Sequence, residues 1–217
     1  REVARANGGR GMTTLLLVRH GETPWNAESR VQGWAATGLT DRGTAQARAL
    51  GTWLDRTADI DRVVASDLER TRVTAATIRE AADSVPEPTY DGTLRERGFG
   101  VYQGFPVAAM VDRFPDHDHD KSILTLPVDP LNGESFETFT ARIERGWDRV
   151  TEAAGDGETT LVVTHGGVLK YLRGLLTDGE PAASLARDSP PNCSVTTVRL
   201  DGATPELVEY GATPWDE

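Results

Sequence analysis

The stretch Leu15-Leu16-Leu17-Val18-Arg19-His20-Gly21 decides the fold, because an apolar run ends abruptly at a charged pair and a glycine. A short run of this kind is typical of a buried strand that delivers polar groups at its carboxyl end. A second apolar run, residues 161–164, ends in the same way at His165 and Gly166. The two strands can be neighbours in one sheet, and we expect a functional site where they end.

Strands and helices are predicted to alternate along most of the chain. Strands are expected at 13–19, 62–66 and 159–164, and helices after Thr40 and at 68–82, 134–154 and 168–176. Two further alternating stretches, 194–200 and 206–210, predict a hairpin at the edge of the sheet. Alternation of strand and helix is the pattern of an α/β fold. We therefore predict a three-layer α/β/α sandwich with a mostly parallel central sheet, antiparallel edge strands and a cap-like insertion.

Glycines and prolines are concentrated in the middle of the chain. Residues 92–132 predict loops with one short helix near 107–114, and about 105–132 is interpreted as the cap-like insertion. Residues 1–11 are polar and are expected to be a disordered leader, with Met12 as the natural start. We predict a single domain over 12–217, because α/β folds of this size are commonly undivided.

Composition narrows the classes of partner. The chain has 217 residues and a net charge of −11. Nucleic-acid binding requires a basic surface, so this charge argues against nucleic acid as a partner. An anionic ligand would need arginines gathered in one cleft. No apolar run approaches the roughly 18 residues of a membrane span. The single cysteine, Cys193, forbids an internal disulfide and fits a reducing compartment, so we predict a cytoplasmic protein. The oligomeric state is left as either monomer or homodimer.

Three places in the sequence suggest chemistry: the Arg19-His20 pair, Arg70 and Glu96. Arg19 beside His20 suits anion recognition, because the planar guanidinium matches phosphate oxygens. Arg70 falls at the start of a predicted helix, where unpaired N–H groups favour anions. Glu96 lies among closely spaced glycines, so its carboxyl group could approach a ligand and donate a proton. Each also has a plainer interpretation: a loop histidine for His20, and surface ion pairs for Arg70 and Glu96.

Taken together, these residues resemble the histidine phosphatase superfamily, also called the phosphoglycerate mutase-like family. The resemblance runs from about residue 13 to residue 200. Four motifs carry it in the family's order: Arg19-His20-Gly21-Glu22-Thr23 followed by Trp25 and Asn26, Ser66-Asp67-Leu68-Glu69-Arg70-Thr71, Leu94-Arg95-Glu96 with Phe99-Gly100, and Thr164-His165-Gly166-Gly167.

The resemblance implies roles for these residues. It implies that His20 is the nucleophile that forms a phosphohistidine intermediate, and that Glu96 is the proton donor. It implies a phosphate pocket made by Arg19, Arg70 and His165. Further substrate contacts are implied for Asn26, Gln32, Gly33 and Gly166. The family's chemistry implies neither a metal nor a cofactor.

Two branches of the family remain open. Gln103 stands where many phosphatases have glutamate and favours the mutase branch, whereas the missing aspartate near Ala36 affects only a structural contact. The segment 105–132 holds Arg113 and Lys121 against five aspartates, so it would repel the bisphosphoglycerate that mutases hold. We therefore favour hydrolysis of a phosphomonoester, with a small phosphorylated metabolite as substrate. A cofactor-dependent phosphoglycerate mutase is the alternative, and a non-catalytic phospho-ligand-binding protein is the third hypothesis.

The run Asp116-His117-Asp118-His119-Asp120 also contains residue types that bind metals. Its spacing matches no closed metal site. We interpret it as a solvated acidic loop.

Overall fold

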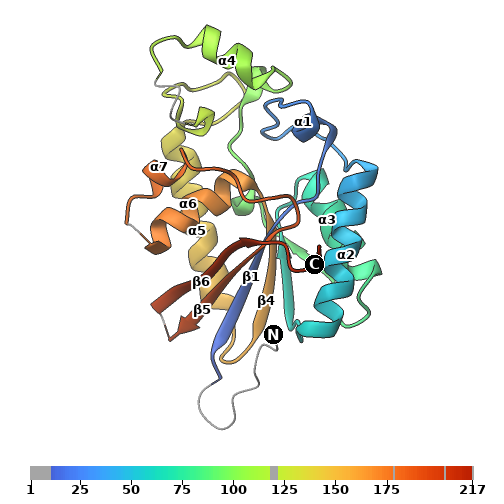
Figure 1. Cartoon of the computed structure of the whole chain (residues 1–217). Coiled ribbons are helices and arrows are strands. Elements are labelled where there is room, and N and C mark those ends of the chain that lie inside the picture. Colours follow the sequence, from blue (N-terminus) through green and yellow to red (C-terminus); the bar gives the residue numbers. More distant parts are fainter. Residues whose placement is uncertain (1–10, 118–121, 178, 203, 217) are drawn as a thin grey trace.

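One six-stranded sheet organises the chain in the computed structural model, which describes residues 11–117, 122–177, 179–202 and 204–216 (Figure 1). The strand order is β3-β2-β4-β1-β5-β6. Strands β1 to β4 pair in parallel, and β5 pairs antiparallel with both β1 and β6. The strands are β1 (Thr13–Arg19), β2 (Arg62–Ala65), β3 (Thr89–Tyr90), β4 (Thr159–Thr164), β5 (Val195–Asp201) and β6 (Thr204–Ala212).

The two apolar runs of the sequence are neighbouring strands, as predicted. Arg19 in β1 is in register with Thr164 in β4, so His20 and His165 follow adjacent strand ends. The His20 N–H donates to the Thr164 carbonyl over 3.0 Å, which extends the ladder by one residue. The runs are apolar at every position because both faces of the sheet are covered.

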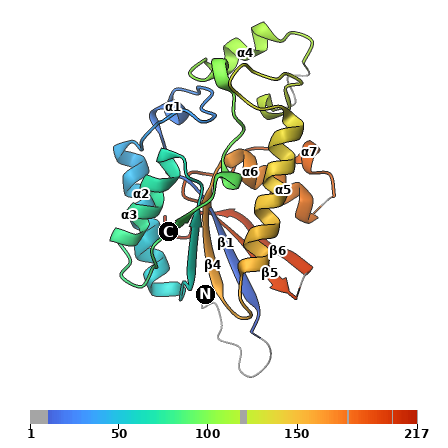
Figure 2. The same cartoon turned by 180° about the vertical axis from the view of Figure 1, so that it is seen from behind.

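Helices cover both faces, which confirms the three-layer sandwich (Figures 1 and 2). On one face, α2 (Asp41–Thr57) and α3 (Glu69–Glu80) pack against alternate residues of β1, including Leu16. On the other face, α5 (Phe136–Ala153) and α6 (Gly166–Thr177) pack against Leu15 and its neighbours. Helix α2 begins after Thr40, whose side chain accepts from the Gly43 N–H, as expected for an N-cap.

The cap lies beyond the carboxyl ends of the parallel strands, at the end of the molecule where α4 (Val107–Arg113) is drawn (Figure 1). This helix confirms the short helix predicted near 107–114. The buried Arg97 holds one segment of the cap in place by donating to the carbonyls of Leu124, Leu126 and Val128. The short elements around it are α1 (Pro24–Ala27), η1 (Gly92–Leu94), η2 (Gly100–Tyr102) and η3 (Ile123–Thr125).

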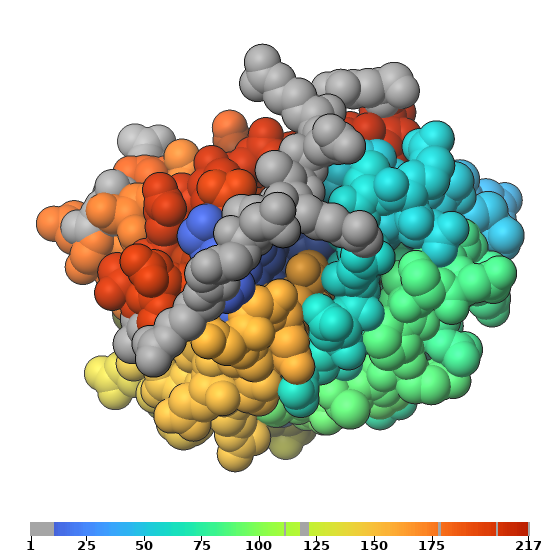
Figure 3. Space-filling model, turned by 90° about the horizontal axis from the view of Figure 1, so that it is seen from below, coloured from blue at the N-terminus to red at the C-terminus, as the bar shows by residue number. Residues whose placement is uncertain are grey.

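At the opposite end of the sheet, chain segments that are distant in sequence lie side by side (Figure 3). The Thr14 N–H donates to the Glu158 carbonyl, and the Asp61 N–H donates to the Thr159 carbonyl. Thr13 pairs with Leu200 across β1 and β5. None of the helices within the described ranges is long and apolar enough to cross a membrane.

Three short elements and one helix boundary differ from the predictions. The sequence did not predict α1, β3 or α7 (Pro181–Ser184), which are too short to show a period. Helix α6 begins at Gly166 instead of 168. The Gly167 N–H donates to the Glu96 carboxylate over 2.9 Å, so a distant side chain satisfies a donor at this helix end. The single-domain organisation stays a prediction, and residues 1–10 of the expected leader lie outside the described residues.

Candidate active site

His20 lies at the carboxyl end of β1 and is 3% exposed. Its Nε2 accepts a hydrogen bond from the Arg70 Nε over 3.2 Å, and its Nδ1 lies 2.8 Å from the Gly21 carbonyl oxygen. Since a guanidinium can only donate and a carbonyl can only accept, the bonding pattern assigns the ring proton to Nδ1. The lone pair of Nε2 is therefore free of a proton.

The charge state of His20 follows from its surroundings. Burial, followed by the positive charges of Arg70 and Arg19, lowers its pKa well below the ordinary 6.5. Both effects disfavour the imidazolium form. The ring is accordingly a neutral base at pH 7, as nucleophilic attack requires.

His165 lies at the carboxyl end of β4 and is fully buried. Its ring centroid is 5.3 Å from that of His20, and its Nε2 lies 2.9 Å from the Ser66 Oγ. Burial, then the charge of Arg70, lowers its pKa well below 6.5. Its Nδ1 is buried and has no partner among the described residues. An unpaired buried nitrogen of this kind indicates a place for a ligand atom.

Arg70 reaches the site from the first turn of α3 and is 1% exposed. Its terminal nitrogens donate to the carbonyls of Gly33, over 2.8 Å, and Ala35, over 3.4 Å. Burial lowers its pKa to about 10, so the guanidinium is charged at neutral pH. Gly33 has a φ of +53°, a left-handed conformation that suits glycine and turns its carbonyl towards Arg70.

Arg19 is the last residue of β1 and supplies the second guanidinium. It donates to the Pro190 carbonyl over 2.7 Å, while its buried Nε has no partner among the described residues. Burial lowers the pKa of Arg19, although the Glu96 carboxylate opposes this effect. The half-buried guanidinium of Arg19 and the buried one of Arg70 thus concentrate positive charge in one place on a chain whose net charge is −11.

Glu96 is held in place through both its side chain and its backbone. One carboxylate oxygen accepts from the Arg97 N–H over 3.0 Å, and the other accepts from the Gly167 N–H. Its backbone carbonyl accepts from Trp34 Nε1 over 2.7 Å and from Arg142 over 3.1 Å. A Cβ atom at Gly167 would overlap the Glu96 carboxylate, so any larger residue there would displace that carboxylate from this position.

Two predicted contact residues, Asn26 and Gln32, lie in the loop around Thr23. The Asn26 Oδ1 accepts from the Thr23 N–H over 3.2 Å, and the Gln32 Oε1 accepts from the Thr23 Oγ1 over 2.9 Å. Both amide oxygens therefore face the protein, and the loop's own bonds explain them without a ligand. Gly166 opens α6 beside Arg19, since a Cβ atom there would lie 3.5 Å from the Arg19 Nε.

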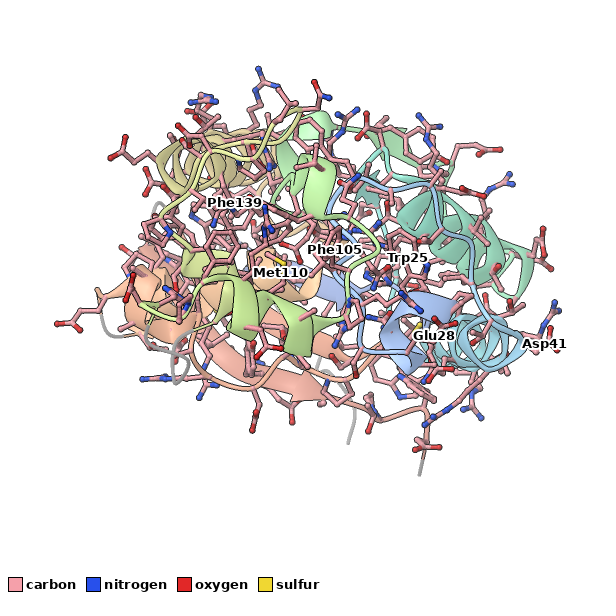
Figure 4. All side chains as sticks on the ribbon, turned by 90° about the horizontal axis from the view of Figure 1, so that it is seen from above. Trp25, Glu28, Asp41, Phe105, Met110 and Phe139 are labelled. Carbon is pink, nitrogen blue, oxygen red and sulfur yellow. The ribbon has the colours of Figure 1, made fainter. Side chains whose placement is uncertain are left out.

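The cap side of this site carries apolar side chains. In the view onto the cap, Trp25 and Phe105 lie near the centre of the molecule (Figure 4). Phe105 is 42% exposed, and Trp25 closely approaches Gly104.

Among the described residues no group of three or more His, Cys, Asp and Glu could hold a metal ion. Residues 118–120 of the acidic run lie outside the described residues.

Four supporting residues escaped the sequence reasoning. Ser66 follows β2 just as His20 follows β1, so the strand-end pattern could have singled it out. The Asn192 Nδ2 donates to the His20 carbonyl over 2.8 Å from a turn that precedes β5. Arg142 and Glu134 form an ion pair beside Glu96, and the Gly98 N–H donates to that Glu134 carboxylate. Glu134 was interpreted only as an acidic residue at the start of the long helix, and no local signal in the sequence pointed to Asn192 or Arg142.

Two adjacent strand ends and the first turn of α3 bring together two guanidiniums and two neutral imidazoles, and this arrangement is suited to phosphoryl transfer. The family model described as "Histidine phosphatase superfamily (branch 1)" matches residues 15–213. The chain belongs to this superfamily.

Named relatives indicate which activities the family includes. The chain is 40% identical over 176 residues to the adenosylcobalamin/alpha-ribazole phosphatase of Salmonella typhimurium, covering 79% of this chain and 82% of that one. It is 34% identical over 189 residues to a probable phosphoglycerate mutase GpmB of Citrobacter koseri, covering 86% and 85%. The structure of Bacillus stearothermophilus YhfR matches with a TM-score of 0.82 and 31% identity, covering 94% of this chain and 100% of that one. The protein is an enzyme of the phosphatase type.

Proposed function

We propose that the protein hydrolyses phosphomonoesters of small metabolites through a phosphohistidine formed at His20. One observation carries the proposal: the Nε2 of His20 is unprotonated, and Arg70 holds it beside a second neutral histidine. A neutral imidazole is a competent nucleophile, and the adjacent guanidinium can bind the phosphoryl group under attack.

In the first step, the Nε2 of His20 attacks phosphorus, so an N–P bond forms while the ester P–O bond breaks. Arg19, Arg70 and His165 bind the three non-bridging oxygens. The unpaired Nε of Arg19 and the unpaired Nδ1 of His165 support this role. Glu96 in its acid form gives its proton to the leaving oxygen, which departs as an alcohol.

In the second step, water attacks the phosphohistidine. The Glu96 carboxylate takes a proton from this water, the N–P bond breaks, and inorganic phosphate leaves. His20 returns to its neutral form, and Glu96 is again protonated. The guanidiniums of Arg19 and Arg70 supply the positive charge that phosphoryl transfer needs, so we assign no step to a metal or a cofactor.

The remaining contact residues complete the proposed site. Asn26 and Gln32 keep their amide oxygens on Thr23, which leaves their N–H₂ groups to contact phosphate or the leaving group. Gly33 orients Arg70 through its carbonyl. Gly166 places the amino end of α6 beside Arg19, where the positive end of the helix dipole favours a bound anion.

We also propose a cytoplasmic enzyme whose partner is its small-molecule substrate, with neither nucleic acid nor membrane as a partner. The acidic net charge and the single cysteine support this proposal. Monomer and homodimer remain alternatives.

A phosphoglycerate mutase is the second candidate, and the relative from Citrobacter koseri favours it. Gln103, which suggested the mutase branch, has a structural explanation: its Oε1 accepts from the Trp34 N–H over 2.6 Å. The acidic cap segment still favours hydrolysis. A non-catalytic binding protein is least favoured, because every group that the proposed mechanism needs is present.

The experiment is phosphate release from p-nitrophenyl phosphate in the presence of EDTA. We expect steady turnover, loss of activity in His20→Ala, and trapping of a phosphorylated wild-type chain by rapid quenching. Activity that persists in His20→Ala would overturn the mechanism. Interconversion of phosphoglycerates only after priming with 2,3-bisphosphoglycerate would establish the mutase instead.

A further inference from the structure

Lys170 in α6 is a buried cation that the proposed mechanism does not use. It is 6% exposed, although it carries an ammonium group. Within the described ranges no hydrogen bond or ion pair satisfies its Nζ. The Nζ is not among the fully buried atoms that lack a partner, so the ammonium group at the end of this largely buried side chain keeps contact with solvent and is open to a ligand.

The helix directs Lys170 towards the candidate active site. It lies four residues after Gly166 and three after Gly167, so the three residues share one face of α6. Helical side chains lean towards the amino end of their helix, which here is the turn that contacts the site. The two glycines place no side chain between Lys170 and that turn.

The charges around Lys170 locate it between two groups of the site. Burial lowers its pKa, the Glu96 carboxylate opposes this effect, and Arg19 adds to it. The exposed Asp188 also raises the pKa, but less than Glu96 does. None of these groups is close enough to form an ion pair. The Gly167 N–H donates to the Glu96 carboxylate, and a Cβ atom at Gly167 would point at that carboxylate, so the face of α6 that carries Gly167 and Lys170 is turned towards Glu96. Lys170 therefore lies on the side of the pocket where the leaving oxygen is proposed to depart.

We propose that Lys170 determines specificity by binding a carboxylate that the substrate carries on its leaving group, near the ester oxygen. The inference rests on the proposed function, because Glu96 marks the leaving side only if it donates the proton. The phosphoryl oxygens already have Arg19, Arg70 and His165. A further cation beside Glu96 is therefore available to the alcohol part of the substrate, and a compact ammonium suits a single carboxylate.

The test compares substrates that differ in the carboxylate. The pairs are 3-phosphoglycerate with glycerol 3-phosphate, and phosphoserine with O-phosphoethanolamine. The measured quantity is the ratio of kcat/KM within each pair. We expect Lys170→Met to lower this ratio by about tenfold or more, the size of one lost charge-assisted hydrogen bond. Arg145→Met, which removes one exposed charge from α5, is the matched control and should leave the ratio as in the wild type.

Other outcomes discriminate clearly. An equal loss for both members of a pair would overturn the proposal and indicate a role at the phosphoryl group or at Glu96. A wild type that does not prefer the carboxylated members, or an unchanged ratio in Lys170→Met, would also overturn it. Lys170→Gln, checked by thermal unfolding, provides a second variant if Lys170→Met does not fold. Failure of the proposed function would look different, because then even the wild type would release no phosphate from any ester.

Discussion

The Arg70 Nε donates to the His20 Nε2 over 3.2 Å, although the two residues are 50 positions apart in the sequence. This bond, together with the Gly21 carbonyl on the other nitrogen, leaves the lone pair of Nε2 unprotonated. The same guanidinium is anchored on the Gly33 carbonyl, so its direction is set by the protein. The proposed nucleophile, His20, and the proposed phosphate-binding residue, Arg70, are thus oriented together as one unit.

Replacing Arg70 by lysine tests this unit. An ammonium cannot bond the Gly33 carbonyl and the His20 ring in the fork geometry of arginine, so charge is kept while orientation is lost. We expect kcat for p-nitrophenyl phosphate to fall about a hundredfold. Arg72→Lys is the control, because Arg72 lies on the same helix with its guanidinium over the exposed ring of Tyr90. Equal kcat values for the two variants would contradict the role of Arg70.

Protonation of His20 and His165 should make stability depend on pH. Burial above all lowers both pKa values well below 6.5, so the folded rings stay neutral while unfolded rings bind a proton near that pH. The unfolded state then binds more protons, and the free energy of unfolding decreases as pH falls below about 6.5. For two histidines the slope of the free energy of unfolding against pH approaches about 2.7 kcal/mol per pH unit. Their contribution is fully present above that pH.

Urea unfolding between pH 7.5 and pH 5 measures this slope. In His165→Asn we expect about half of it to remain, because one of the two buried imidazoles is gone. A variant with the full wild-type slope would show that His165 does not stay neutral in the fold.

Ser66 should act by orienting His165. Its Oγ lies 2.9 Å from the His165 Nε2, and Ser66 itself is buried. In Ser66→Ala we expect kcat to fall about tenfold, the size of one hydrogen bond of about 1.5 kcal/mol. Ser84→Ala is the control, since that serine bonds Asp55 on the exposed surface. A wild-type kcat in Ser66→Ala would remove the proposed orienting role.

Glu96→Gln tests proton donation through the nature of the leaving group. An alkoxide needs a proton to depart, whereas p-nitrophenolate is a good leaving group without one. We expect kcat/KM to fall far more for glycerol 3-phosphate than for p-nitrophenyl phosphate. Glu137→Gln, an exposed residue of α5, should not separate the two substrates. Parallel losses for both esters in Glu96→Gln would contradict general acid catalysis.

The strands that position the site were predictable because their signal is local. Every residue of Leu15–Val18 is apolar, which requires cover on both faces of the sheet, and the run ends at polar groups. The predicted neighbours β1 and β4 follow from the same reasoning. Strand β3 was missed, since two exposed residues carry no pattern and pair only because β2 offers an edge.

The hydrogen-bond partners of Glu96 could not be predicted from local sequence patterns. The motif residues around Glu96 were visible in the sequence, but its partners come from α5, from α6 and from Trp34. Arg142 contacts this segment from 46 positions away. No periodicity within a helix or strand records such a contact, because it depends on how separate elements pack.

The sequence by itself determined the class of fold, the adjacency of the two main strands and the family to which the chain is similar. These depend on hydrophobic periodicity and on motifs within a few residues. The tertiary structure alone decided the tautomer of His20, the anchoring of Arg70 on Gly33, and the burial of the Lys170 side chain. Each depends on desolvation and on hydrogen-bond directions between distant segments, which exist only once the sheet and its helices have packed.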